Sequence, residues 1–455
     1  MNIPSGTSPP PARAPAALAR MLKTLAAVEP SEVRAVLLSM FYFLFLFGSY
    51  SVTKPVRDTM GTVYGMGNLP QLFTATLFAT LVFAPLYSGL ASRMKLSTFL
   101  PWVYGFVALT VLIFWALFVS GRYADRWIAA AFYVWLSTFN MLIISVFWTF
   151  MADIFSREQA KRLFGFIAAG ATIGGIIGPA IAAFAKTIGE NNLLLIAAGG
   201  FVVTAVLVSM LAREKQRLLA QGTEVQHTTL DHGLGGNPLD GFLLLLRSRY
   251  LLLLALFLLL MTWISTIVYF QLGDLISKAY PDKAARTQAY STIELIVNSF
   301  AIVMQLFGTG RIIKRFGVQT GLLLNPVIMV IAFLAVAFSP VLMILGGIQV
   351  IRRVAEYAVA KPTREMLFTV VDQQSRYKAK NVIDTVVYRF GDVSAAWVSA
   401  AVLPFGVAGL AIFGAITSVV WFPVAYLLGK RYESVRSGEL VSAASGAEGH
   451  GVARP

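Results

Sequence analysis

Residues 35–58 read AVLLSMFYFLFLFGSYSVTKPVRD, an apolar run that ends in three charged side chains. The part from 35 to 53 is long enough to cross a hydrocarbon core about 30 Å thick as a helix. Lys54, Arg57 and Asp58 then follow within five residues, where an unpaired charge in the membrane costs free energy. The stretch predicts a membrane-spanning helix whose charged end faces a cavity or a partner.

Similar apolar runs recur along the whole chain. Hydrophobic residues make up 57% of the 455 residues and charged residues only 13%, whereas a soluble domain is about 45–50% apolar. This composition predicts an all-α polytopic membrane protein with twelve transmembrane helices. The expected spans are residues 35–53, 69–91, 99–119, 127–152, 163–185, 193–211, 250–272, 290–307, 318–338, 341–371, 382–403 and 407–428.

The positive charges indicate how the chain is oriented. Most of the 37 Lys and Arg residues fall in the tails and in the connections after even-numbered spans, and basic connections stay on the cytoplasmic side. We therefore expect both termini in the cytoplasm. This distribution explains the net charge of +15 without nucleic acid as a partner. Because the chain has no cysteine, disulfides and thiolate metal sites are excluded, and no cofactor is expected.

One long polar connection, residues 213–249, divides the chain into two halves. Basic motifs repeat across it about 220 residues apart: GLASRMK (89–95) with GRIIKRFG (310–317), and SREQAKRLFG (156–165) with QQSRYKAKN (373–381). The repeats predict two six-helix bundles. The expected parts are a disordered cytoplasmic tail at 1–34, bundles at 35–212 and 250–430, a cytoplasmic central loop at 213–249, and a second disordered tail at 431–455.

This layout resembles the major facilitator superfamily. Residues 174–183, GGIIGPAIAA, are similar to the glycine and Gly-Pro pattern of that superfamily's fifth helix. Gly170, Gly174 and Gly178 share one helix face, which allows a neighbouring backbone to approach closely. The resemblance implies that the first, fourth, seventh and tenth helices line a central cavity.

Seven cations lie inside the expected spans and are candidates for function, because such charges face a cavity or a partner. They are Lys54, Arg57, Arg352, Arg353, Lys361, Arg364 and Arg389. Two pentapeptides, KPVRD (54–58) and KPTRE (361–365), share the pattern Lys-Pro-x-Arg-acid. Because proline disfavours the helix at and before its position, we expect a kink or break at each pentapeptide.

Two roles for these charges remain open. In one, the cations bind a phosphorylated or otherwise anionic substrate, since Arg binds phosphate oxygens bidentately. In the other, each arginine pairs with its adjacent acid and with the other pentapeptide, and these ion pairs form an interdomain gate. The expected substrate-binding residues are Lys54, Arg57, Lys361, Arg364 and Arg389, and the expected gating or ion-pair residues are Asp58, Glu294, Glu356, Glu365 and Asp384.

Residues 361–392, KPTREMLFTVVDQQSRYKAKNVIDTVVYRFGD, resemble the signature of the ATP/ADP translocases of plastids and obligate intracellular bacteria. The resemblance rests on Pro362, Thr363, Arg364, Glu365, Met366, Lys378, Lys380, Ile383, Asp384, Arg389 and Gly391. It implies a transporter of phosphorylated anions, with ATP and ADP as possible substrates, in the inner membrane of a bacterium. The lipid bilayer is then the only other partner, and we expect a monomer.

Two other functions fit the same composition. One is a proton-coupled symporter or exporter of another solute, with Glu294 or Glu356 as the titrating carboxylate. The other is a transport-inactive membrane scaffold or sensor. No Gly-x4-Gly-Lys-Ser/Thr phosphate loop occurs in the sequence, so an ATP-hydrolysing pump is not expected, and we expect a secondary transporter rather than an enzyme.

Overall fold

A computed structural model describes residues 28–30, 32–91, 96–121, 125–220, 240–371, 379–380 and 382–448. Nearly all of these residues are helical, and no strand occurs among them, which confirms the all-α prediction. The helices of the first half are α2 (Val33–Tyr64), α3 (Leu69–Ala91), α4 (Leu96–Val119), α5 (Arg126–Ile154), α6 (Arg157–Ala182), α7 (Ala185–Ile188) and α8 (Asn192–Ala220).

The second half begins with the short helix α9 (Asp240–Arg247). It continues with α10 (Arg249–Ala279), α11 (Lys283–Phe307), α12 (Thr309–Phe338), α13 (Leu342–Ala355), α14 (Lys361–Leu367), α16 (Tyr388–Val402) and α17 (Gly406–Glu448). Two π-helices, η3 (Glu356–Ala360) and η4 (Ile383–Val387), and two 3-10 turns, η1 (Met66–Asn68) and η5 (Leu403–Phe405), complete the described elements.

Ten helical segments in the described residues are long and apolar enough to cross a membrane. One of them, Tyr388–Gly438, includes the expected span 407–428 and most of the span 382–403, because α16, η5 and α17 follow one another directly. The expected span 341–371 is absent from the ten, because α13, η3 and α14 divide it into short pieces. A membrane protein of many spans is thus confirmed, and the count of twelve stays a prediction.

The two proline pentapeptides differ in structure. Pro55 lies inside α2, which continues as one helix to Tyr64, so the helix is not broken at KPVRD, and a kink there stays a prediction. The Thr53 hydroxyl donates a 2.8 Å hydrogen bond to the Tyr50 carbonyl, and such hydroxyls help to support a helix next to a proline. At KPTRE the regular helix does change, because the π-helix η3 ends directly before Lys361.

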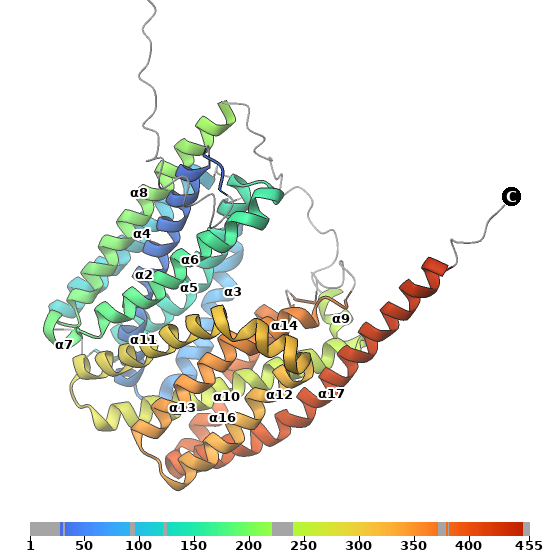
Figure 1. Cartoon of the computed structure of the whole chain (residues 1–455). Coiled ribbons are helices and arrows are strands. Elements are labelled where there is room, and N and C mark those ends of the chain that lie inside the picture. Colours follow the sequence, from blue (N-terminus) through green and yellow to red (C-terminus); the bar gives the residue numbers. More distant parts are fainter. Residues whose placement is uncertain are drawn as a thin grey trace, which may run out of the picture.

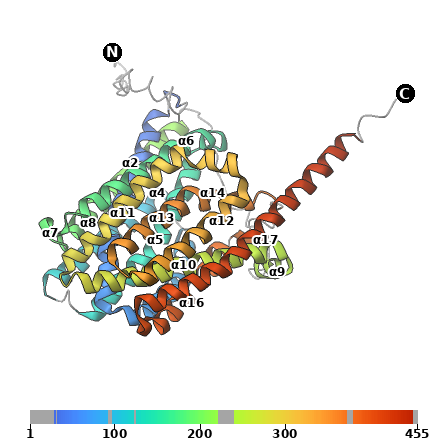
Figure 2. The same cartoon turned by 60° about the horizontal axis from the view of Figure 1, so that its bottom comes forward.

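The termini and the central loop also differ from the expected boundaries. Helix α2 begins at Val33, and α8 continues to Ala220. The tail expected from residue 431 is helical as far as Glu448, because no proline interrupts residues 424–448. Figure 2 shows that this part of α17 extends beyond the rest of the bundle. Residues 1–27, 221–239 and 372–378, the last including Lys378, lie outside the described residues.

The buried apolar side chains form two large clusters, one on each side of the central connection. The first contains residues between Val28 and Ala212, and the second contains residues between Leu245 and Tyr432. Figure 1 shows the corresponding blue-to-green and yellow-to-red halves side by side. A third, smaller cluster joins the halves near the end of α2, where Tyr64 and Met66 belong to the same cluster as Phe270. The halves are therefore closed against each other at this end.

The glycine face of α6 packs closely against α2. A Cβ atom added at Gly170 would lie 2.1 Å from the Met40 carbonyl oxygen, and one at Gly174 would lie 2.5 Å from the Leu44 carbonyl oxygen. At Gly178 the nearest atom would be Ser51 Cβ, at 2.6 Å. The close backbone approach expected from this glycine pattern is confirmed, and it fixes α2 with its charged end toward the second half.

Candidate functional site

A cavity of about 380 Å³ lies between the two halves, with walls from α2, α3 and α5 on one side and α10, α11, α13, η3 and α16 on the other. Five cations and four carboxylates line it: Lys54, Arg57, Arg352, Arg353, Arg389, Asp58, Glu294, Glu356 and Asp392. Sites for charged small molecules combine such convergent polar groups with an enclosed space. The cavity is the candidate site.

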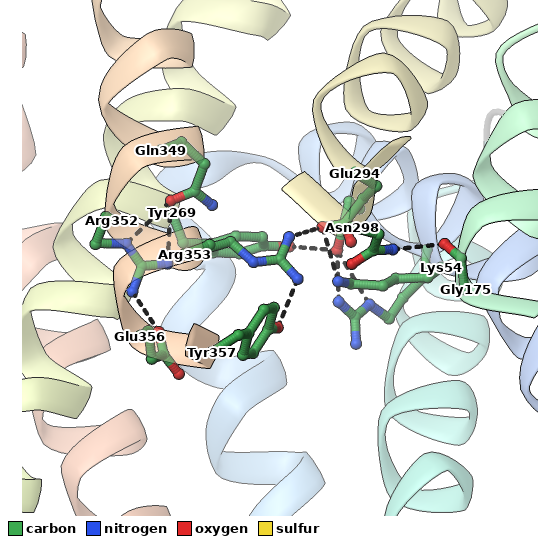
Figure 3. A network of polar contacts seen from close by, with 12 residues as sticks. Lys54, Gly175, Tyr269, Glu294, Asn298, Gln349, Arg352, Arg353, Glu356 and Tyr357 are labelled. Carbon is green, nitrogen blue, oxygen red and sulfur yellow. Dashed lines mark hydrogen bonds and ion pairs between the residues drawn. The ribbon is translucent and has the colours of Figure 1, made fainter. Parts of the chain in front are cut away.

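Glu294 on α11 lies between two cations from different halves. Lys54 Nζ of α2 is 2.7 Å from Glu294 Oε1, and the Arg353 guanidinium of α13 donates to the same oxygen. Arg353 also donates a 2.7 Å hydrogen bond to the Tyr357 hydroxyl. Figure 3 shows the side chains of Lys54 and Arg353 converging on Glu294. One carboxylate therefore serves two cations, which leaves the cluster with a net positive charge.

Arg352 is held by a different set of partners, all in the second half. Its guanidinium donates to Gln349 Oε1 at 3.0 and 3.1 Å, to Ser265 Oγ at 2.6 Å and to Glu356 Oε2 at 3.0 Å. Gln349, Arg352 and Glu356 lie on successive turns of α13 and η3 (Figure 3). This packing fixes the orientation of Arg352 at the cavity wall.

Near the closed end, Arg57 and Asp58 form a second charged pair. Arg57 donates to Asp58 Oδ1 at 3.1 and 2.7 Å, and the Tyr269 hydroxyl of α10 donates to the same oxygen at 3.0 Å. The guanidinium carbon of Arg57 also lies 5.4 Å from the centre of the Tyr133 ring. The Asp58–Tyr269 bond thus joins the first half to the second.

Helix α11 carries further bonds between the halves. Asn298 Nδ2 donates to the Gly175 carbonyl of α6 at 2.6 Å, and the hydroxyls of Thr287 and Thr59 lie 2.7 Å apart. Sequence analysis expected Glu294 as a gating or ion-pair residue, and in the structure it pairs with Lys54 and Arg353. The structure places Glu294 in the middle of a helix that touches the first half both before and after it.

Four of the predicted site residues, Lys361, Arg364, Glu365 and Asp384, are not among the residues that line the cavity. Arg364 lies 3.0 Å from Glu365 and 3.3 Å from Asp384, and Lys380 Nζ lies 2.5 Å from Glu365. Lys361 Nζ lies 4.2 Å from the centre of the Tyr357 ring. We call Arg364, Glu365, Lys380 and Asp384 the α14–η4 cluster.

The structure thus separates the predicted residues into two groups. Lys54, Arg57, Arg389, Asp58, Glu294 and Glu356 line the cavity. The predicted sets omitted Arg352, Arg353 and Asp392. For Arg352 the sequence did contain a signal. Arg352 and Glu356 are four residues apart in an apolar run, which is the spacing of an ion pair on one helix face.

The π-helices connect the two groups. Helix η3 begins at Glu356 in the cavity and ends just before Lys361, and η4 contains Asp384 and ends just before the cavity residues Tyr388 and Arg389. Single π-helical turns occur frequently at functional sites. A change in either segment would therefore move cavity residues and cluster residues together.

An all-helical membrane protein with a charged cavity between two halves is a transporter by class, and solved structures share this fold. A bacterial homologue of the iron transporter ferroportin, in an inward-facing state, is 12% identical with a TM-score of 0.61, covering 88% of this chain and 99% of that one. A mutant of the nucleoside transporter NupG is 14% identical with a TM-score of 0.53, covering 89% and 99%. These similarities support a fold like that of the major facilitator superfamily.

The sequence comparisons are more specific. The sequence model of the TLC ATP/ADP transporters matches residues 120–429, so the chain belongs to the TLC ATP/ADP transporter family. A relative, ADP,ATP carrier protein 1 of Chlamydia pneumoniae, is 24% identical over 433 residues, covering 80% of this chain and 83% of the relative. The resemblance found in residues 361–392 is thereby confirmed.

Proposed function

We propose that this protein exchanges nucleotides of the ATP and ADP type across a bacterial inner membrane by alternating access. Its family and the ADP,ATP carriers among its relatives support this function. The observation that carries the proposal is the Lys54–Glu294–Arg353 cluster. Two cations there share one carboxylate, and they can bind an anion in its place. The distribution of Lys and Arg favours cytoplasmic termini, and we propose a monomer.

Substrate binding begins with replacement of Glu294. A phosphate group entering the cavity presents several anionic oxygens, and it forms charge-assisted hydrogen bonds to Lys54 and Arg353 in place of the carboxylate. Arg57, Arg352 and Arg389 supply further positive charge along the cavity wall. Lys361 and Arg364 do not line the cavity, so they do not take part in this first contact with the substrate.

The same replacement explains why transport is an exchange. In the empty protein, the Lys54–Glu294 bond joins α2 to α11 and must break when the halves move. Breaking it without a replacement leaves charges unpaired in a poorly solvated site, which is costly. A bound anion provides the replacement, so the loaded protein reorients readily and the empty one slowly.

Two sets of contacts act as gates. At the closed end, Asp58 and Tyr269 join the halves. On the other side of the π-helices, the α14–η4 cluster of Glu365, Asp384 and their cationic partners links α14 to the start of the next helix. We propose that Glu356, which lies between these two gates at the start of η3, transmits a movement of Arg352 to the α14–η4 cluster.

Purified protein in liposomes tests the proposal. Labelled ADP and ATP should enter liposomes loaded with ADP or ATP and should enter empty liposomes far more slowly. Lys54→Ala should lower exchange about 100-fold, since truncating one partner of a buried charge pair costs about 2–5 kcal/mol. Lys186→Ala, at an exposed position on α7, is the control. Equal uptake into empty and loaded liposomes, or unchanged exchange in Lys54→Ala, would contradict the proposal.

A further inference from the structure

The cavity has a second wall with a different chemistry. The charged residues Lys54, Glu294 and Arg353 come from α2, α11 and α13, whereas α3 and the middle of α5 contribute uncharged side chains. These are Phe73, Thr76, Ser137 and Asn140. A ligand that fills the cavity therefore meets neutral polar and aromatic side chains as well as charged ones.

Two polar groups on this neutral wall have no partner among the described residues. Ser137 Oγ and Asn140 Oδ1 are buried, and neither atom forms a hydrogen bond with the described residues. The two residues are three positions apart on α5, so their side chains lie on one face of the helix. Because buried polar groups are normally hydrogen-bonded, each such group needs an explanation. Both residues line the cavity, so a bound ligand can supply the missing partner.

We propose that Asn140 and Ser137 bind the nucleobase while Lys54 and Arg353 bind the phosphates, an assignment that rests on the proposed function. A carboxamide carries an acceptor and a donor side by side, which matches the donor and acceptor along one edge of adenine. Phe73 also lines the cavity and adds an aromatic ring to it, as base-binding sites often have.

This arrangement makes Asn140 a residue that determines specificity. A site built to hydrogen-bond a ligand group rejects analogues that lack this group, because its own buried polar atoms then remain unpaired. Uracil carries a carbonyl oxygen where adenine carries its amino group, and its single ring places this edge nearer the ribose, so uracil does not present a donor to Asn140 Oδ1 at the same point. The protein should therefore prefer ADP over UDP, and Asn140 should be the source of the preference.

The test compares a whole nucleotide with a bare anion. Binding of ADP, UDP and pyrophosphate to the full chain in detergent is measured by calorimetry, for wild type, Asn140→Ala and Ser137→Ala. Asn140→Ala should weaken ADP binding about tenfold, the loss expected for one bidentate base contact. It should also remove the preference for ADP over UDP and leave pyrophosphate binding unchanged.

Thr138→Val is the matched control, because Thr138 Oγ1 is also buried without a partner but does not line the cavity. It should leave all three affinities unchanged. If Asn140→Ala weakens ADP and pyrophosphate equally, or leaves ADP binding unchanged, the nucleobase assignment is overturned and nucleotide binding is not. If wild-type protein binds neither ADP nor pyrophosphate, the proposed function itself fails.

Discussion

Lys54 and Glu294 are 240 positions apart in the sequence, yet Lys54 Nζ lies 2.7 Å from Glu294 Oε1. The bond joins the first half of the protein to the second, and Arg353 donates to the same carboxylate oxygen. Both acid and cations are largely buried, with the Lys54 side chain 21% exposed and the Glu294 side chain 11% exposed. This cluster is therefore both a contact between the halves and a preformed site for an anion.

Replacing Glu294 with Gln should change ligand binding and stability in opposite directions. An anion would no longer compete with a carboxylate, so we expect ADP to bind about tenfold tighter, since a hydrogen bond to a charged group contributes about 1.5–3 kcal/mol. The empty protein should be destabilised by about 3–5 kcal/mol, because two buried cations lose their counter-ion. Calorimetry and thermal unfolding measure the two effects. Glu433→Gln, on the part of α17 beyond the cavity, should change neither, and unchanged ADP affinity in Glu294→Gln would contradict the displacement mechanism.

Gly174→Ala should destabilise the contact between α2 and α6. The new methyl group would meet the Leu44 carbonyl oxygen at 2.5 Å and the Gly48 nitrogen at 2.8 Å, and these backbone atoms cannot move without shifting α2. Overpacking of this kind costs about 1–3 kcal/mol. Gly199→Ala on α8 is the control, because an added Cβ there meets no atom within 4 Å. Thermal unfolding should show a lower Tm for Gly174→Ala only, and equal Tm values would contradict the packing argument.

The contact between the starts of α2 and α6 should depend on pH. Glu32 accepts hydrogen bonds from Arg162 at 2.7 and 2.5 Å and from Gln159 at 2.8 Å. Burial raises the pKa of Glu32, but these bonds, together with one from the Glu29 amide, outweigh burial, so its pKa lies below the ordinary value of 4.5. Because the folded protein holds the proton less tightly than the unfolded chain, the stabilisation is complete above about pH 4.5 and is lost as the pH falls through the lowered pKa.

The measurement is the difference in Tm between wild type and Glu32→Gln. This difference should be constant from pH 7 to about pH 5 and should shrink as the pH falls further. Glu158→Gln, at an exposed position near the start of the same helix, should show no such trend. A Glu32 difference that persists unchanged at pH 3 would show that the carboxylate's charge is not responsible.

The α14–η4 cluster should affect transport rate more than binding. Its members lie outside the cavity, and Glu365 and Lys380 are 48% and 37% exposed, so the Glu365–Lys380 pair contributes only about 0–1 kcal/mol to stability. We expect Lys380→Gln to change the maximal exchange rate several-fold while KM stays near that of wild type. Initial rates over a range of external ADP separate the two constants. A rise in KM with an unchanged maximal rate would place Lys380 at the binding site instead.

A change in helix phase explains why Lys361 and Arg364 do not line the cavity with Lys54. Sequence analysis had predicted all three as substrate-binding residues. Lys361 and Arg364 lie in the same apolar run as Arg352 and Arg353, and a kink or break was expected only at the pentapeptide 361–365 itself. The π-helix η3 at Glu356–Ala360 inserts an extra residue into that turn, which rotates all following side chains by about 100°. The side chains of α14 therefore leave the cavity wall, and nothing in the local sequence specifies this rotation.

The opposite case is Pro55, where local rules predicted a kink or a break and the helix is not broken. A proline removes one backbone donor and disfavours the preceding helical conformation, yet α2 continues through it. Before the proline, Gly48 and Ser51 of α2 pack closely against α6, and after it Asp58 and Thr59 form hydrogen bonds to the second half. Tertiary packing thus overrides a local preference here.

The sequence by itself determined that the chain is a bundle of membrane helices and that its few intramembrane charges matter. Both conclusions follow from the cost of placing polar groups in hydrocarbon, which depends on composition along a single segment. Only the tertiary structure decided which charges meet: Glu294 with Lys54 and Arg353, and Asp58 with Arg57 and Tyr269. Such pairing depends on the rotation and packing of helices that are distant in sequence. The partners of an ion pair lie a few ångströms apart in space, but the sequence around one partner does not identify the other.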